Sequence, residues 1–267
     1  LGNYPDALEC EITALDLARR HGDRETEAAA LNIIGLVYSV MGDHESALKR
    51  FRESMSIFRE LGLRKGEADA LDNIGRLQLE LGHFVDAREY GHRGLSLYQE
   101  IGAVLAEAEA RESLGKAYMA QGQHAAALRE FEECLRIARR IRNKLVETLA
   151  RVHIGEIHAL QGDLSTGLSI LHQALEMAGE SRSKLRMLEV HQALARVYRL
   201  AGEPGRAFDH LEQFHAIWVE VFNERADSRL KALQAIHEVE SARREAKLQQ
   251  QANAALEQEI VERRRVE

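Results

Sequence analysis

Residues 31–58, LNIIGLVYSVMGDHESALKRFRESMSIF, hold the pattern that decides the fold. Apolar or small residues recur every three or four positions on both sides of Gly42. These positions are Leu31, Ile34, Gly35 and Tyr38 before the glycine, and Ala47, Leu48, Phe51, Met55 and Phe58 after it. This period is typical of a helix face and differs from the alternation of a strand. The stretch therefore predicts two helices joined by a glycine turn, with Asp43 accepting a backbone N–H bond at the start of the second helix.

The same pattern returns along the chain without insertion or deletion. Glycines equivalent to Gly42 follow one another at a spacing of 40 residues, at Gly2, Gly42, Gly82, Gly122, Gly162 and Gly202. Small residues also recur seven positions before these glycines, at Gly35, Gly75, Gly115, Gly155 and Ala195. Small residues let two helix backbones approach closely, so we expect Gly35 and its equivalents to lie against bulky residues such as Phe51. The sequence predicts an array of repeated helix pairs.

The motif Leu31-x-x-Ile34-Gly35-x-x-Tyr38, followed by Ala47-x-x-x-Phe51 and a small residue at Ser54, resembles the tetratricopeptide repeat in a version of about 40 residues. The resemblance covers residues 1–222. It implies an all-α fold, a right-handed superhelical solenoid of one half repeat and five full repeats. It also implies a non-catalytic module that binds a protein or peptide in its concave groove.

By this resemblance, the first helix of each repeat lines the groove. The candidate partner-binding residues are Asn32, Leu36, Asp72, Arg76, Glu112, Lys116, Arg196 and Arg199. The Asn32 amide can both donate to and accept from a peptide backbone, and the arginine and lysine side chains can hold carboxylates. The alternative interpretation is that Asp72 with Arg76, and Glu112 with Lys116, form ordinary ion pairs between residues four apart on a helix.

Residues 223–267 contain no glycine or proline and predict one long charged helix. A weak heptad runs through it and includes Val239, Asn253, Leu256 and Ile260, which we expect to form the dimer contacts of a parallel coiled coil. A solvated helix without a partner is the alternative.

Residues 242–265 resemble the helical linkers that precede output domains in bacterial signalling proteins. This resemblance implies that the array is the input region of such a protein, whose output is a diguanylate cyclase, a cyclic-dinucleotide phosphodiesterase or a histidine kinase. We expect further chain before Leu1, because the sequence opens directly on a second helix. A purely structural dimerisation module and the regulatory domain of a transcriptional regulator are the alternatives.

Other chemistry is not indicated by the sequence. The net charge is −7, which gives no general reason to expect nucleic-acid binding, and no apolar stretch is long enough for a membrane span. The glycines form no phosphate-binding loop, and the histidines lack the spacing of metal ligands, so we expect no cofactor or metal. Cys134 aligns with small packing residues and Cys10 with exposed positions. We expect an unreactive thiol at Cys134, and two cysteines so far apart indicate a reducing, cytoplasmic location.

Overall fold

A computed structural model describes residues 4–223 of the chain, and every regular element in this range is an α-helix. The helices are α1 (Tyr4–His21), α2 (Arg24–Met41), α3 (His44–Glu60), α4 (Arg64–Glu80), α5 (Phe84–Glu100), α6 (Val104–Ala120), α7 (His124–Arg140), α8 (Lys144–Leu160), α9 (Leu164–Glu180) and α10 (Lys184–Leu200). A further helix, α11, occupies residues 204–223. The prediction of an all-helical repeat array is confirmed. Val239, Asn253, Leu256 and Ile260 lie outside the described residues, so the coiled coil stays a prediction.

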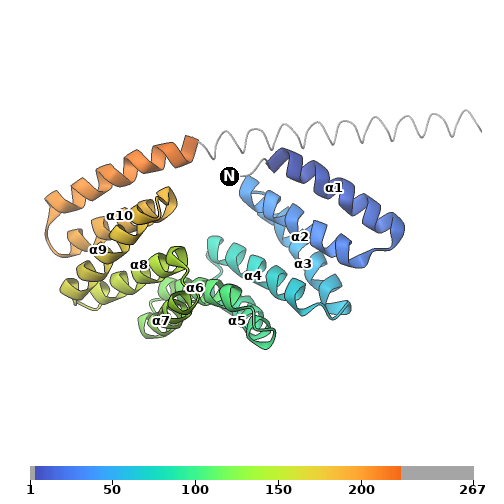
Figure 1. Cartoon of the computed structure of the whole chain (residues 1–267), viewed down its shortest axis with the longest axis horizontal. Coiled ribbons are helices and arrows are strands. Elements are labelled where there is room, and N and C mark those ends of the chain that lie inside the picture. Colours follow the sequence, from blue (N-terminus) through green and yellow to red (C-terminus); the bar gives the residue numbers. More distant parts are fainter. Residues whose placement is uncertain (1–3, 224–267) are drawn as a thin grey trace, which may run out of the picture.

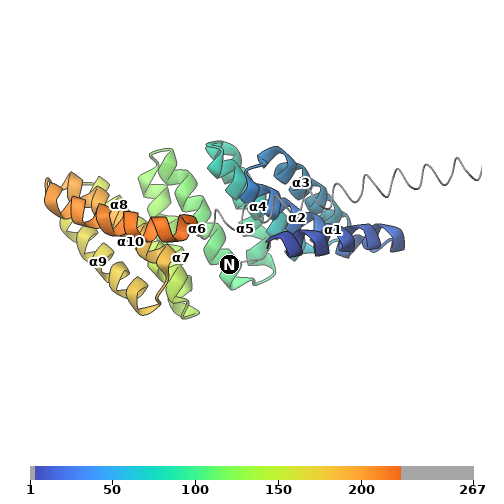
Figure 2. The ribbon, with the colours of Figure 1, turned by 90° about the horizontal axis from the view of Figure 1, so that it is seen from above.

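The helices stack as an arc in which each contacts the helices before and after it (Figure 1; Figure 2). Even-numbered helices also contact the next even-numbered helix, from α2 through α10. We call the surface formed by α2, α4, α6, α8 and α10 the concave surface. The buried apolar residues form several clusters strung along the arc, as expected for a solenoid without a single centre.

The turns between helices recur every 20 residues and usually contain a glycine with positive φ. These glycines are Gly22, Gly42, Gly62, Gly82, Gly102, Gly122, Gly162 and Gly202. A left-handed backbone ends each helix at no steric cost to glycine. At the two remaining turn positions Arg142 and Arg182 adopt φ of 56° and 50°.

Close packing within a repeat depends on the small residues of its first helix. A Cβ atom built on Gly115 would lie 2.5 Å from the Phe131 ring, and one on Gly35 would lie 2.6 Å from Phe51. The predicted contact between these glycines and a bulky residue is confirmed. The predicted cap at Asp43 is also confirmed, because Ser46 N–H donates to its Oδ1 at 3.1 Å.

Ion pairs repeat with the helices. One type joins the start of a first helix to the end of the second helix of the same repeat, 36 residues later: Arg24–Glu60 (3.3 Å), Arg64–Glu100 (4.0 Å), Lys144–Glu180 (2.8 Å) and Lys184–Glu220 (3.1 Å). Another type joins the end of a second helix to the next first helix: Arg19–Glu27 (2.9 Å), Arg59–Glu67 (3.8 Å) and Arg139–Glu147 (3.2 Å). Most of these arginines and lysines are about half exposed, so each pair contributes little alone.

Candidate functional site

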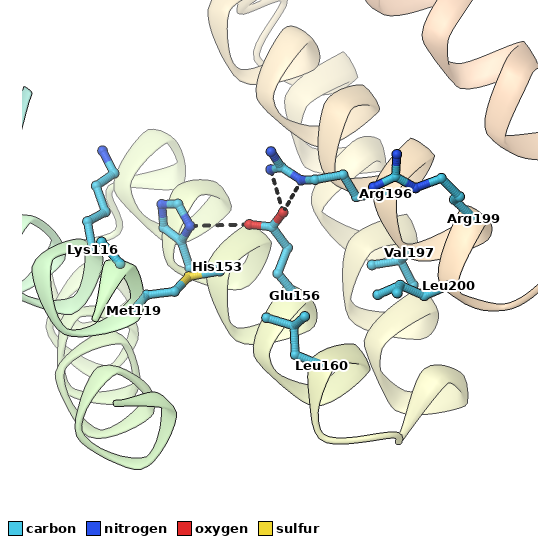
Figure 3. Close-up of a pocket in the computed structure, with 10 residues that line it drawn as sticks. Lys116, Met119, His153, Glu156, Leu160, Arg196, Val197, Arg199 and Leu200 are labelled. Atoms are coloured by element: carbon cyan, nitrogen blue, oxygen red, sulfur yellow. Dashed lines mark hydrogen bonds and ion pairs between the residues drawn. The ribbon is translucent and has the colours of Figure 1, made fainter. Parts of the chain in front are cut away.

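One hollow of the concave surface lies between α6, α8 and α10 and has a volume of about 490 Å³ (Figure 3). We call it the α6–α10 pocket. Its lining residues are Lys116, Met119, Ala120, His153, Glu156, Leu160, Arg196, Val197, Arg199 and Leu200. Apolar side chains and cations therefore face the same space.

The apolar part of this pocket is open to solvent. The side chains of Leu160 and Leu200, at the ends of α8 and α10, are 50% and 52% exposed. Two exposed leucines at the mouth of one pocket provide apolar surface that a ligand can cover, with a gain in free energy roughly proportional to the area removed from water.

A polar network crosses the floor of the pocket and links three repeats. Glu112 on α6 accepts a bond from His153 Nε2 on α8 at 3.2 Å and pairs with Lys116 Nζ at 2.6 Å. On the other side of the imidazole, His153 Nδ1 lies 3.6 Å from Glu156 Oε2, and Arg196 Nε on α10 donates to Glu156 Oε1 at 2.8 Å (Figure 3). Both glutamates are buried.

The network keeps its buried carboxylates ionised. Burial raises the pKa of Glu112, but the His153 hydrogen bond and the Lys116 charge outweigh it and lower that pKa to about 2. The pKa of Glu156 is lowered in the same way by His153 and Arg196. For His153, burial lowers the pKa, but the bonds to both glutamates outweigh this and raise it. The His153 ring also stacks on Phe131 at 4.6 Å between centroids, which fixes its orientation.

The cations differ in how many of their donors are free. Lys116 and Arg196 are paired to buried glutamates, whereas Arg199 is exposed and has no ion-pair partner among the described residues. An anionic group in the pocket would therefore bind Arg199 first and use the remaining donors of Arg196.

A smaller hollow of about 300 Å³ lies beside this pocket, between α10 and α11. It is lined by Gln192, Ala195, Arg196, Arg199, Ala207 and Leu211. Arg196 and Arg199 line both hollows, so a ligand held by these arginines also reaches α11.

A third hollow, of about 570 Å³, lies between α2, α4 and α6, and we call it the α2–α6 pocket. Its lining includes Asn32, Asp69, Asp72, Arg76 and Glu109. The Asn32 carbonyl oxygen already accepts a bond from Asn73 Nδ2 at 3.1 Å, which leaves the Asn32 amide hydrogens for a ligand.

Of the two ion pairs expected from spacing, only one forms. Lys116 Nζ lies 2.6 Å from Glu112, whereas Asp72 and Arg76 form no ion pair within 4 Å in the described part of the chain. Burial, helped by the nearby charges of Glu109 and Glu112, outweighs the opposing charge of Arg76 and raises the pKa of Asp72 to about 6. The interpretation of Asp72 and Arg76 as a bonded pair is therefore wrong.

The predicted groove residues thus fall into two pockets. Lys116, Arg196 and Arg199 line the α6–α10 pocket, and Asn32, Asp72 and Arg76 line the α2–α6 pocket. Glu112 is buried beneath Lys116 and His153. Leu36, 42% exposed on α2, lines none of the three hollows described above.

Sequence reasoning missed His153 as the centre of the network and Leu160 and Leu200 as the apolar wall. A signal existed for His153, because Glu112 and His153 are 41 residues apart, the same spacing as Asn32 and Asn73. A separation of one repeat plus one residue brings polar side chains of neighbouring first helices together.

Within residues 4–223, no group of three or more metal-ligating side chains is placed to hold a metal ion. None of the helices described is long and apolar enough to cross a membrane. Cys134 is fully buried, and burial raises the pKa of its thiol to about 12, which disfavours the reactive thiolate.

A sequence model described as a tetratricopeptide repeat matches residues 1–60, 26–100 and 146–218, and a second model with the same description matches residues 108–144. No curated protein matches the chain.

Solved structures share the fold. The crystal structure of BtubC (BKLC) from P. vanneervenii aligns with a TM-score of 0.66 at 15% identity, covering 82% of this chain and 92% of that one. The apo form of RapI aligns with a TM-score of 0.65 at 14% identity, covering 88% and 93%. The Rap conjugation gene regulator of the plasmid pLS20, solved in complex with the Phr* peptide, aligns with a TM-score of 0.56 at 14% identity, covering 88% and 74%.

Proposed function

The chain belongs to the tetratricopeptide repeat family, and from that membership we propose that it binds a peptide or a segment of a partner protein on its concave surface, without catalysing a reaction. The observation that carries this proposal is the α6–α10 pocket. Its exposed leucines stand beside Arg199, a cation without a partner among the described residues.

The chemistry of the pocket defines the ligand. An apolar side chain covers Leu160 and Leu200, while an adjacent carboxylate binds Arg199 and the free donors of Arg196. The Rap regulator solved with the Phr* peptide supports a peptide ligand, because it has the same kind of fold.

We further propose that binding is relayed through α11 to an output domain. Arg196 and Arg199 line the hollow that α11 closes with Ala207 and Leu211. A ligand on these arginines therefore contacts the helix from which the chain continues beyond residue 223. Protection of residues 204–223 from hydrogen exchange on peptide binding would support the relay, and unchanged exchange there would remove it.

The binding proposal is tested with peptides selected from a random phage-displayed library on the wild-type protein. We expect selected peptides to combine acidic and apolar residues. The double variant Leu160→Ala/Arg199→Ala should bind them at least about tenfold more weakly in fluorescence anisotropy, because it loses one apolar contact and one charge-assisted hydrogen bond. Leu160 is half exposed, and Arg199 is exposed and has no ion-pair partner among the described residues. The fold should therefore be retained in this variant.

The matched control is Val85→Ala/Arg129→Ala, which removes one exposed apolar residue and one exposed arginine from α5 and α7, outside the concave surface. This variant should keep wild-type affinity. If the selected peptides bind Leu160→Ala/Arg199→Ala as tightly as the wild type, the α6–α10 pocket is not the binding site.

A further inference from the structure

Two arginines occupy turn positions where the backbone favours glycine. Of the ten turns within residues 4–223, eight hold a glycine with positive φ, and the other two hold Arg142 and Arg182, both in the left-handed region. A side chain in this conformation places its Cβ close to the following carbonyl oxygen, which destabilises the folded state relative to glycine. Both side chains are exposed and lack ion-pair partners within the described residues, so no contact of the fold compensates for this strain.

The two turns lie side by side on one edge of the solenoid. Arg142 lies between α7 and α8, and Arg182 between α9 and α10. Lys144 Nζ, two residues after Arg142, lies 2.8 Å from Glu180, two residues before Arg182. This ion pair joins the segments that carry the strained arginines.

The edge has an excess of positive charge. Arg140, exposed in the last turn of α7, also lacks an ion-pair partner within 4 Å in the described structure. The nearby acids Glu107, Glu147 and Glu180 are already paired, with Arg111, Arg139 and Lys144 respectively. We call Arg140, Arg142 and Arg182 the arginine edge. These three arginines, which have no ion-pair partner among the described residues, lie at two neighbouring turns of a protein whose net charge is −7.

We propose that the arginine edge docks an acidic segment of a partner protein, at a surface separate from the concave pockets. Backbone strain at an exposed residue that makes no stabilising contact within the fold suggests that its side chain binds another molecule. Guanidinium groups bind carboxylates through paired hydrogen bonds. An acidic segment fits better than a nucleic acid, because three cations on a negatively charged protein cannot follow an extended phosphate backbone.

The test uses the full chain and a fluorescein-labelled oligoglutamate peptide, with binding followed by anisotropy at low salt. The variant Arg142→Gly/Arg182→Gly should bind the peptide about tenfold more weakly, since it loses two exposed charge contacts. The same variant should melt at a higher temperature than the wild type, because glycine removes the strain. If the variant binds more weakly although it is more stable, the loss of binding cannot be due to unfolding.

Two further variants complete the test. Arg142→Lys/Arg182→Lys keeps both charges but loses the paired hydrogen bonds of the guanidinium groups, so its affinity should lie between those of the wild type and the glycine variant. Arg52→Gln/Arg129→Gln removes two exposed arginines from the middle of α3 and α7, with the same change in net charge, and should also bind like the wild type.

Three results would overturn the proposal. The glycine variant could bind the peptide as tightly as the wild type, or the control variant could lose as much affinity as the glycine variant. A DNA duplex could also bind the wild type more tightly than the peptide does, with this binding lost in the glycine variant. That result would assign the arginine edge to nucleic acid.

Discussion

Gly115 connects the packing of the fold to the candidate site. The missing side chain of Gly115 leaves room for Phe131, which is fully buried, and the Phe131 ring stacks on the His153 ring of the polar network. The absence of a side chain at Gly115 on α6 thus fixes the position of Phe131, and through it the position of the His153 imidazole on α8. The same arrangement explains why this small residue falls in the repeating pattern.

Replacing Gly115 with alanine should destabilise the protein by about 1–3 kcal/mol, because the new methyl group overlaps the Phe131 ring in a closely packed core. The measurement is the free energy of unfolding in urea. Gly179→Ala is the matched control, since no atom lies within 4 Å of its added Cβ, and there alanine should stabilise the helix by about 0.5–1 kcal/mol. Equal effects of the two changes would contradict the packing account.

At the scale of helices, the concave surface is connected by polar bonds across repeats as well as by packing. Glu112, His153, Glu156 and Arg196 join α6, α8 and α10 in one chain of contacts. Each buried carboxylate has a positive partner, which the low polarity of its surroundings requires. The network fixes the spacing of the helices that form the α6–α10 pocket.

The network should make stability depend on pH through His153. Its pKa in the folded protein is raised above the ordinary value of about 6.5, so protonation is favoured by folding. This stabilisation is fully present at pH values below the pKa that His153 has in the unfolded chain. It is lost as the pH rises through the pKa that His153 has in the folded protein. The difference in unfolding free energy between the wild type and His153→Gln should therefore shrink as pH rises from about 6 to 9. A difference that stays constant over this range would show that His153 does not gain a proton on folding.

At the scale of the whole molecule, stability is a sum of neighbouring contacts rather than the property of one core. A local change should then alter the stability of the neighbouring helices only. In Gly115→Ala, hydrogen exchange should accelerate in α5 to α8 and remain close to the wild type in α1 and α2. Mass spectrometry of peptic fragments resolves these regions, and uniform acceleration along the chain would indicate a single cooperative unit instead.

Local patterns in the sequence predict most of the fold. The turn at Gly42, the cap at Asp43 and the packing of Gly35 on Phe51 all depend on residues close in sequence. The site is predicted less well, because it depends on how one repeat sits on the next. Asp72 and Glu112 both precede a cation by four residues, yet only Glu112 pairs with that cation. Glu112 also receives a bond from His153 of the next repeat, whereas the residue 41 positions after Asp72 is Ser113.

The two series of ion pairs have an evolutionary consequence. Since their partners recur at fixed distances within a 40-residue period, recombination between equivalent points of two repeats would change the length of the array by whole units. Loss of residues 64–103, for example, would place Glu107 eight positions after Arg59, in the register now held by Glu67. The interfaces therefore tolerate gain or loss of whole repeats, and the length of the groove can evolve separately from the contacts that stabilise it.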